Sequence, residues 1–219
     1  MEIQEAKQKI WEAGKRLLVE GLVKGTWGNI SLRVNQETMV ITPSGREYQD
    51  LKPDEIVEVN ILTRAFKGNI KPSSEFGMHT EIFRHREHIQ AVMHIQPPSA
   101  STVAAARREV PPILDDMARL IGPSIRVAEH TRAGTRKLEK LALKALKGRM
   151  ACLLANDGAV CIGRDLEEAF VVSQVLEKAC RAFIEAEFLG GAKSIGKVEA
   201  YLMHQYYLNK YSKEKKRSR

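Results

Sequence analysis

Long apolar runs and an apolar signal region are both missing from this sequence. The longest apolar runs, such as residues 150–155, fall far short of the ~20 residues that a membrane-spanning helix needs. Residues 1–17 carry charges throughout, so they do not resemble a secretion signal. These absences argue against a membrane protein, and we expect a cytoplasmic location.

Cysteine is also scarce. Cys152, Cys161 and Cys180 form no CxxC pair, and their odd number leaves one thiol over in any disulfide scheme. Each has apolar neighbours in the sequence, so we expect three buried free thiols. A chain of 219 residues can bury a sizeable core and needs neither a disulfide nor a structural metal to fold.

Positive charge is in excess, but half of it lies in the last eight residues. The formal net charge is +8, and residues 212–219 (SKEKKRSR) contribute five basic residues and one acid. We expect this tail to be disordered and solvated. No RNP, zinc-finger or helix-turn-helix pattern accompanies it, so nucleic-acid binding is not predicted. Small anionic substrates explain a mildly basic body equally well.

Hydrophobic periodicity predicts one domain over residues 1–211. Helical patterns cover residues 2–20, 76 to about 88, 99–108, 115–121, 136–147, 165 to about 190, and 196–211. Strand patterns cover residues 29–34, 39–41, 56–61, 91–95, 124–128, and 151–162 with an Asn-Asp-Gly hairpin signal at 156–158. Strands cluster in the middle and helices flank them. The pattern favours a layered α/β (α+β) fold with a central, mostly antiparallel sheet.

Three loops concentrate small hydrogen-bonding residues. They cover residues 25–29, 42–45 and 72–75, and each lies at the edge of a regular element. Hydroxyls, an amide and glycine N–H groups can hold a phosphate where no Walker lysine is present. Turns and helix caps are the alternative, since Ser74 is by itself a good N-cap.

Four polar side chains outside these hydroxyls are candidates for chemistry. His94 ends a strand pattern and shares a face with Gln96. Glu75 lies at a helix start, where the helix dipole favours the carboxylate. Asp157 lies at the hairpin tip, where Asp-Gly is common for geometric reasons alone. His79 lies one helical turn after Glu75 and either supports it or packs in the core.

Six segments in order resemble the class II aldolase/adducin family. They are GTWGNISLR, ITPSG, PSSEFGMH, AVMHIQ, NDGAVCIG and the helical stretch 166–177, and together they run along nearly the whole chain. The resemblance implies the family fold. It also implies a phosphate site made by seven residues: Thr26, Asn29, Thr42, Ser44, Gly45, Ser73 and Ser74. In the same comparison Glu75 matches the catalytic carboxylate that transfers the substrate proton, with Glu rather than Asp favouring the aldolase branch.

The metal site implied by the resemblance is altered. The family has His-x-His on the strand and a third histidine in an Asn-His-Gly turn. Here those positions hold His94, Gln96 and Asp157. With Glu75, the set has three oxygen ligands and one nitrogen, which shifts preference from Zn²⁺ toward harder ions such as Mn²⁺ or Mg²⁺. Zinc, manganese, magnesium, iron and the absence of a metal all stay open.

Family members are commonly four-fold tetramers with active sites at subunit boundaries. The resemblance therefore implies a homo-oligomer, in which His130 and a C-terminal tyrosine, Tyr207 or Tyr211, could reach a neighbouring site. His130 takes the place of a family tyrosine ahead of Gly134.

The resemblance implies an aldehyde-lyase that cleaves a small phosphorylated ketose by a metal-assisted retro-aldol reaction. Two alternatives stay open. One is a non-catalytic sugar-phosphate-binding member of the family. The other is a metal-independent isomerase, epimerase or decarboxylase, in which His94 and Glu75 act as acid and base.

Overall fold

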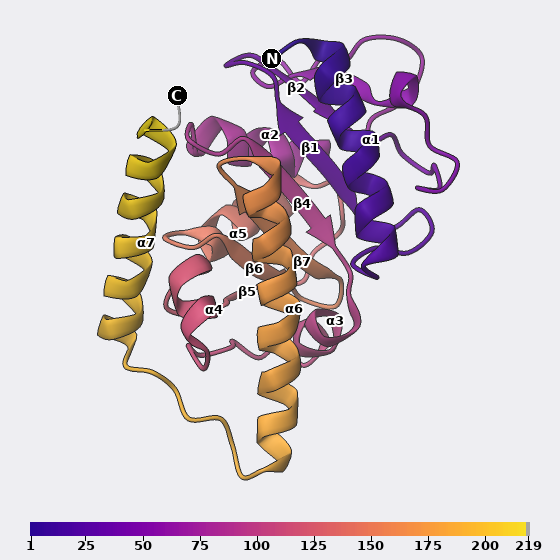
Figure 1. Ribbon diagram of the computed structural model, residues 1–219. Helices are drawn as coiled ribbons and strands as arrows, with labels where there is room; N and C mark the ends of the chain where they lie inside the picture. Colours follow the sequence, from indigo (N-terminus) through magenta and orange to yellow (C-terminus); the bar gives the residue numbers. More distant parts are fainter. Residues whose placement is uncertain (218–219) are drawn as a thin grey trace.

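The chain folds around one mixed sheet (Figure 1). The computed structural model describes the backbone of residues 1–217 and the side chains as far as residue 210. Within these residues seven strands lie in the order β3-β2-β1-β4-β7-β6-β5. Their bounds are β1 Asn29–Arg33, β2 Thr38–Ile41, β3 Val57–Asn60, β4 Ala91–Ile95, β5 Val127–Ala128, β6 Ala151–Leu154 and β7 Gly158–Gly163. All neighbours pair antiparallel except β5 and β6, which confirms the predicted sheet type.

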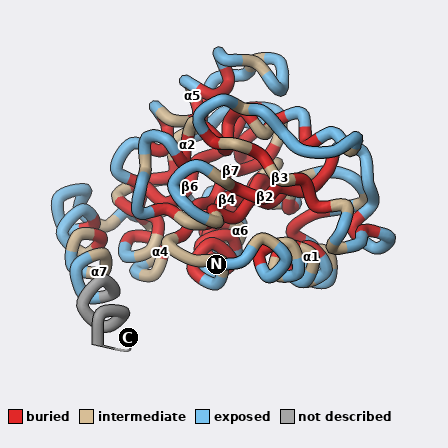
Figure 2. The backbone as a smooth tube through the Cα atoms, turned by 90° about the horizontal axis from the view of Figure 1, so that it is seen from above, coloured by how far each residue is buried: buried red, intermediate tan, exposed pale blue. Residues whose placement is uncertain are grey.

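Helices cover both faces of the sheet. Their bounds are α1 Ile3–Val19, α2 Phe76–His85, α3 Pro98–Ala105, α4 Asp115–Leu120, α5 Arg136–Leu146, α6 Leu166–Phe188 and α7 Lys197–Arg217. Seen from above, the strands lie between α2 and α5 on one side and α1 and α6 on the other (Figure 2). The buried backbone is concentrated in this middle layer. The result is the layered arrangement that the sequence predicts. None of the described helices is long and apolar enough to cross a membrane.

Side-chain alternation assigns each strand residue to one of the two helical layers. Met93 and Cys161 are cross-strand partners on β4 and β7, and both face α6, where the Ser173 hydroxyl lies 3.8 Å from the Met93 sulfur. Cys152 faces the opposite side and lies 3.9 Å from a carbonyl of α5. All three cysteines are buried and free, as predicted, and burial raises the pKa of each thiol.

The predicted elements are confirmed, with shifts at several ends. The β6–β7 turn forms as expected, with Asn156 in the left-handed region at φ 62°. Asp165 caps α6 by accepting the N–H of Glu168 at 2.8 Å. The predicted strand at 124–128 is shorter, because Ile125 pairs back with Val110 and only Val127–Ala128 pair with β6.

Three helices differ from the prediction at their C-terminal ends. α3 stops at Ala105 rather than residue 108, and Arg107 beyond it takes a left-handed conformation at φ 53°. α2 stops at His85 rather than about residue 88, because the chain turns there to bury Ile89 before β4. α7 continues to Arg217, so the backbone of residues 212–217 is helical where a disordered tail was predicted. Lys, Glu and Arg favour helices and extend one that has already formed. Residues 218–219 of that predicted tail lie outside the described residues.

Candidate active site

The candidate site lies at one end of the three central strands, β1, β4 and β7, where α2 begins. Antiparallel pairing places Asn29 at the start of β1 directly opposite His94 near the end of β4. His94 in turn lies opposite Val160 of β7, whose preceding turn carries Asp157. Glu75 occupies the N-cap position of α2, which covers this face. Residues distant in the sequence are thus brought together by strand register and one helix start.

Glu75, Asn29 and His94 form a buried cluster. The Asn29 amide Nδ2 donates to Glu75 Oε2 at 2.8 Å, and His94 Nδ1 lies 2.6 Å from the same oxygen. The exposed fractions are 4% for Asn29, 6% for Glu75 and 2% for His94. A carboxylate this deeply buried is stable only with such partners.

Asp157 lies on the other side of the His94 ring. Its Oδ2 is 3.5 Å from His94 Nε2, and its Oδ1 accepts a hydrogen bond from the Gln96 amide. Asp157 is half-buried, so it lies between the enclosed cluster and the surface. His94 is therefore flanked by two carboxylates, with Gln96 orienting the outer one.

The cluster shifts the pKa values of its members in opposite directions. Burial raises the pKa of Glu75, but the charge of His94 and the hydrogen bonds from His94 and Asn29 outweigh it and hold the pKa at about 2. Burial lowers the pKa of His94, yet the attraction of Glu75 and Asp157 prevails and raises it to about 9. At neutral pH the metal-free cluster thus holds a carboxylate paired with an imidazolium.

The three predicted phosphate loops lie next to one another. Ser73 N donates to Thr42 O and Ser44 N to Lys71 O, both at 3.0 Å, which joins the second loop to the third. Tyr48 N donates to Gly25 O at 3.3 Å, which ties the first loop to the segment after the second.

The hydroxyls of these loops divide into two groups. Those of Thr42 and Ser73 are buried and accept the N–H groups of Ile30 at 3.2 Å and Glu75 at 3.3 Å. The exposed hydroxyls are those of Thr26, Ser44 and Ser74, and Gly45 is exposed beside Ser44. The exposed residues border the buried cluster through Asn29 and Glu75, and their assignment to phosphate stays a prediction.

Ser31 and His79 belong to the same buried face and were not predicted as a pair. The Ser31 Oγ lies 2.6 Å from His79 Nδ1, and both residues are 0% exposed. The sequence held a signal for each, since Ser31 follows Asn29 by two strand positions and His79 follows Glu75 by one helical turn.

The cluster has the composition of a divalent-cation site. One ligand atom each from Glu75, His94 and Asp157 can be chosen so that all lie within 4.8 Å of one another. Glu75 Oε1 and His94 Nε2 are buried and have no hydrogen-bond partner. Two carboxylates and one imidazole fit a cation with mixed oxygen and nitrogen ligands.

The candidates for a neighbouring site are less enclosed. His130 is exposed. The Tyr207 hydroxyl donates to Glu168 Oε1 of the same chain at 3.1 Å. The side chain of Tyr211 lies outside the described part of the structure. Their roles at a subunit boundary stay predictions.

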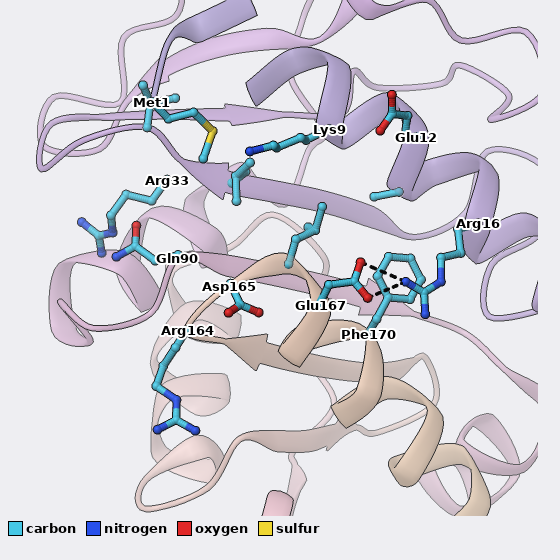
Figure 3. A pocket seen from close by; sticks show the side chains of 14 residues that line it. Met1, Lys9, Glu12, Arg16, Arg33, Gln90, Arg164, Asp165, Glu167 and Phe170 are labelled. Atoms are coloured by element: carbon cyan, nitrogen blue, oxygen red, sulfur yellow. Dashed lines mark hydrogen bonds and ion pairs between the residues drawn. The ribbon is translucent and has the colours of Figure 1, made fainter. Parts of the chain in front are cut away.

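A hollow of about 780 Å³ between α1 and α6 is separate from this cluster (Figure 3). It is lined by Arg33 at the end of β1, Gln90 before β4 and Arg164 after β7, so it lies at the opposite ends of these strands. Among its charged side chains Arg16 pairs with Glu167 at 2.8 Å. The phosphate loops and Glu75 are remote from it, so we do not assign the active site there.

The site combines a buried carboxylate and histidine with three polar loops on a layered fold. Residues 8–184 match the Class II Aldolase and Adducin N-terminal domain, and the chain belongs to that family. The mixed α/β fold, with a seven-stranded sheet flanked by helices, matches class II aldolase structures.

Its relatives include sugar-phosphate aldolases. The chain is 34% identical over 194 residues to the 5-deoxy-D-ribulose 1-phosphate aldolase of Bacillus thuringiensis serovar kurstaki, covering 88% of this chain and 91% of that one. It is 34% identical over 172 residues to the 5-methylthioribulose-1-phosphate/5-deoxyribulose-1-phosphate aldolase of Rhodospirillum rubrum, covering 78% and 77%. A solved L-fuculose 1-phosphate aldolase superposes with a TM-score of 0.88 at 32% identity, covering 93% of this chain and 96% of that one.

Proposed function

We propose that this protein is a sugar-phosphate lyase that cleaves a ketose 1-phosphate by a retro-aldol reaction. The observation that carries the proposal is the buried cluster of Glu75, Asn29 and His94 beside the three joined loops. Phosphate-holding loops adjoining a pre-formed proton-transfer group are what such a reaction needs.

Each part of the chemistry has residues to perform it. The loop hydroxyls, the Gly45 N–H and Asn29 hold the phosphate and the first carbons of the ketose. The C3–C4 bond breaks as the C4 hydroxyl gives its proton to the Glu75 carboxylate, which leaves an aldehyde and the enediolate of dihydroxyacetone phosphate. Glu75 then delivers this proton to C3 of the enediolate and is a carboxylate again at the end of the turnover.

A divalent cation held by Glu75, His94 and Asp157 would supply Lewis-acid polarisation of the substrate oxygens. The remaining contributions come from the chain itself. Gln96 holds Asp157 toward His94, and Asn29 holds one oxygen of Glu75. To act as a ligand, His94 would have to give up the Nε2 proton that it carries as an imidazolium.

The relatives suggest which ketose to test. Two of them are named for 5-deoxyribulose 1-phosphate. We propose the same class of substrate for this chain, a short 1-phosphoketose with an apolar far end. Cleavage of 5-deoxyribulose 1-phosphate between C3 and C4 yields dihydroxyacetone phosphate and acetaldehyde.

Product analysis tests the function. Purified protein is incubated with 5-deoxyribulose 1-phosphate, with Mn²⁺ or Zn²⁺ or with a chelator, and dihydroxyacetone phosphate is measured by a coupled NADH assay. Release of both products supports the lyase. A new ketose or aldose without cleavage supports a metal-independent isomerase or epimerase, which the flanking of His94 by two carboxylates favours as second candidate. Affinity without turnover identifies a binding protein.

We also propose a cytoplasmic homo-oligomer, with a tetramer as the expected form. The support is the family membership and the exposed position of His130. Light scattering on the eluted protein measures the mass directly. A monomer at all concentrations would remove His130, Tyr207 and Tyr211 as contributors to a neighbouring site.

A further inference from the structure

The α2 helix and strand β1 pair their polar side chains in register. Asn29 and Ser31 point to the same face of β1, ~6.7 Å apart along the strand. Glu75 and His79 lie one turn apart on α2, ~6 Å along its axis. The spacing along the strand and the spacing along the helix are similar, so Glu75 pairs with Asn29 and His79 pairs with Ser31. Two buried hydrogen-bonded pairs of side chains therefore join the helix to the strand.

Both pairs leave buried atoms without a hydrogen-bond partner, and one of them is Asn29 Oδ1. Glu75 uses Oε2 for both Asn29 and His94, and its Oε1 is buried without a hydrogen bond. His79 uses Nδ1 for Ser31, and its Nε2 is likewise buried without one. Buried orphan atoms of this kind are costly and normally find a partner or a bound water.

His79 is a neutral imidazole in the folded chain, and its one ring N–H needs a hydrogen-bond acceptor. Burial lowers its pKa to about 3, against the attraction of Glu75, which is the largest favourable charge acting on the ring. A neutral imidazole carries one N–H. If Nδ1 accepts the Ser31 hydroxyl proton, Nε2 carries the hydrogen and can donate to the carboxylate. The opposite tautomer would turn a lone pair toward that negative charge.

We propose that His79 is a positioning residue for Glu75. The Ser31 hydroxyl fixes its tautomer, and the Nε2–H donates to Glu75 Oε1 through one buried water, since neither atom has a direct partner. Glu75 Oε2 thereby keeps its hydrogen bonds with Asn29 and His94, and the carboxylate is held in the rotamer that reaches the substrate. The role in turnover rests on the proposed function, whereas the tautomer does not depend on it.

Two substitutions separate the two ring nitrogens. In His79→Gln the amide nitrogen takes the place of Nε2 and can still donate to Glu75. In His79→Asn the shorter side chain places its amide near the position of Nδ1. This variant keeps the hydrogen bond with Ser31 and loses the interaction with Glu75. We expect kcat to fall ~10- to 100-fold in His79→Asn with KM within about threefold, and to stay within about threefold of the wild type in His79→Gln. His85→Asn, on the exposed side of the same helix, is the matched control.

The tautomer is measured on the unaltered protein. Nitrogen-15 NMR of the histidine rings at neutral pH should show His79 protonated on Nε2, with its Nε2 signal shifting in Glu75→Gln. A proton on Nδ1, or an Nε2 signal unmoved by Glu75→Gln, overturns the proposal whether or not the protein turns over any ketose. Equal kcat values in His79→Gln and His79→Asn overturn it as well. Absence of turnover with the Nε2 tautomer in place would instead refute the proposed function.

Discussion

The two faces of the central sheet are built in opposite ways. The face toward α6 carries Met93 and Cys161. The buried Ser173 hydroxyl of α6, which packs against this face, donates to Ala169 O of the same helix at 2.8 Å. The face toward α2 carries Asn29, Ser31 and His94. Of the five buried polar atoms without a hydrogen-bond partner among the described side chains, four lie on Asn29, Glu75, His79 and His94. The first face stabilises the fold, and the second keeps polar atoms available for chemistry at a cost in stability.

The largest effect should come from restoring the family's histidines on the α2 face. The double variant Gln96→His/Asp157→His gives His94 two further imidazoles. Because Zn²⁺ prefers nitrogen ligands to carboxamide and carboxylate oxygens, we expect zinc affinity to rise about 100-fold or more over the wild type. Competition against a chromogenic chelator measures the change.

The single variants Gln96→His and Asp157→His serve as controls for that double variant. Each should give an intermediate affinity. If the double variant binds zinc no better than the wild type, the three positions do not converge on one cation.

A substitution on the α6 layer should separate stability from function. Leu176 is 0% exposed on α6, so Leu176→Ala should lower the free energy of unfolding by about 2–5 kcal/mol through the cavity it leaves. Urea unfolding measures the loss. At a temperature where the variant stays folded, KM and kcat should match the wild type, and a change in KM would break the division between the two faces.

Asn29→Ala should have the converse effect on the α2 face. This variant loses both the predicted contact of the Asn29 amide with phosphate and its hydrogen bond to Glu75 Oε2. We expect binding of the sugar phosphate to weaken about 10- to 100-fold, measured by calorimetry, since a hydrogen bond to a charged group contributes about 1.5–3 kcal/mol. Unchanged affinity would remove Asn29 from the phosphate site.

The α2 face should also make the protein sensitive to mild acid. The pKa of His79 is about 3 in the folded chain and ~6.5 in the unfolded chain, so the unfolded state binds more protons below pH ~6.5. The free energy of unfolding should therefore fall with pH from ~6.5 downward, by up to ~1.4 kcal/mol per pH unit from this group. His94, with its pKa raised to about 9, takes up protons on folding near pH ~6.5 and opposes this slope there, whereas below pH ~5.5 it is protonated in both states and adds no slope.

Urea titrations between pH ~6.5 and ~5 compare the wild type with His79→Gln, which cannot titrate at this position. Above pH ~4.5 the lowered pKa of Glu75 does not contribute, which isolates the histidine. Equal slopes for the two proteins would show that His79 is not held neutral in the folded state.

The sequence predicted the sheet type and most elements, because periodicity and turn residues are local signals. The grouping of Glu75, His94 and Asp157 came from the family resemblance, since no local pattern joins these residues. The sequence did not predict the bond between Ser31 and His79. That pair depends on how α2 is placed along β1, which no local pattern specifies. The end of α7 was missed for a related reason, since charged residues suit both a solvated tail and a helix extended from a packed start.

The central claim is tested most directly by turnover of 5-deoxyribulose 1-phosphate by the wild type and by Glu75→Gln, each with Mn²⁺ or Zn²⁺ supplied. Glutamine keeps the shape and an acceptor for Asn29 but cannot transfer a proton. The account predicts dihydroxyacetone phosphate from the wild type and at least about a 100-fold lower kcat in Glu75→Gln, with substrate still bound. Equal rates in the two proteins, or no cleavage by the wild type under any metal condition, would contradict it.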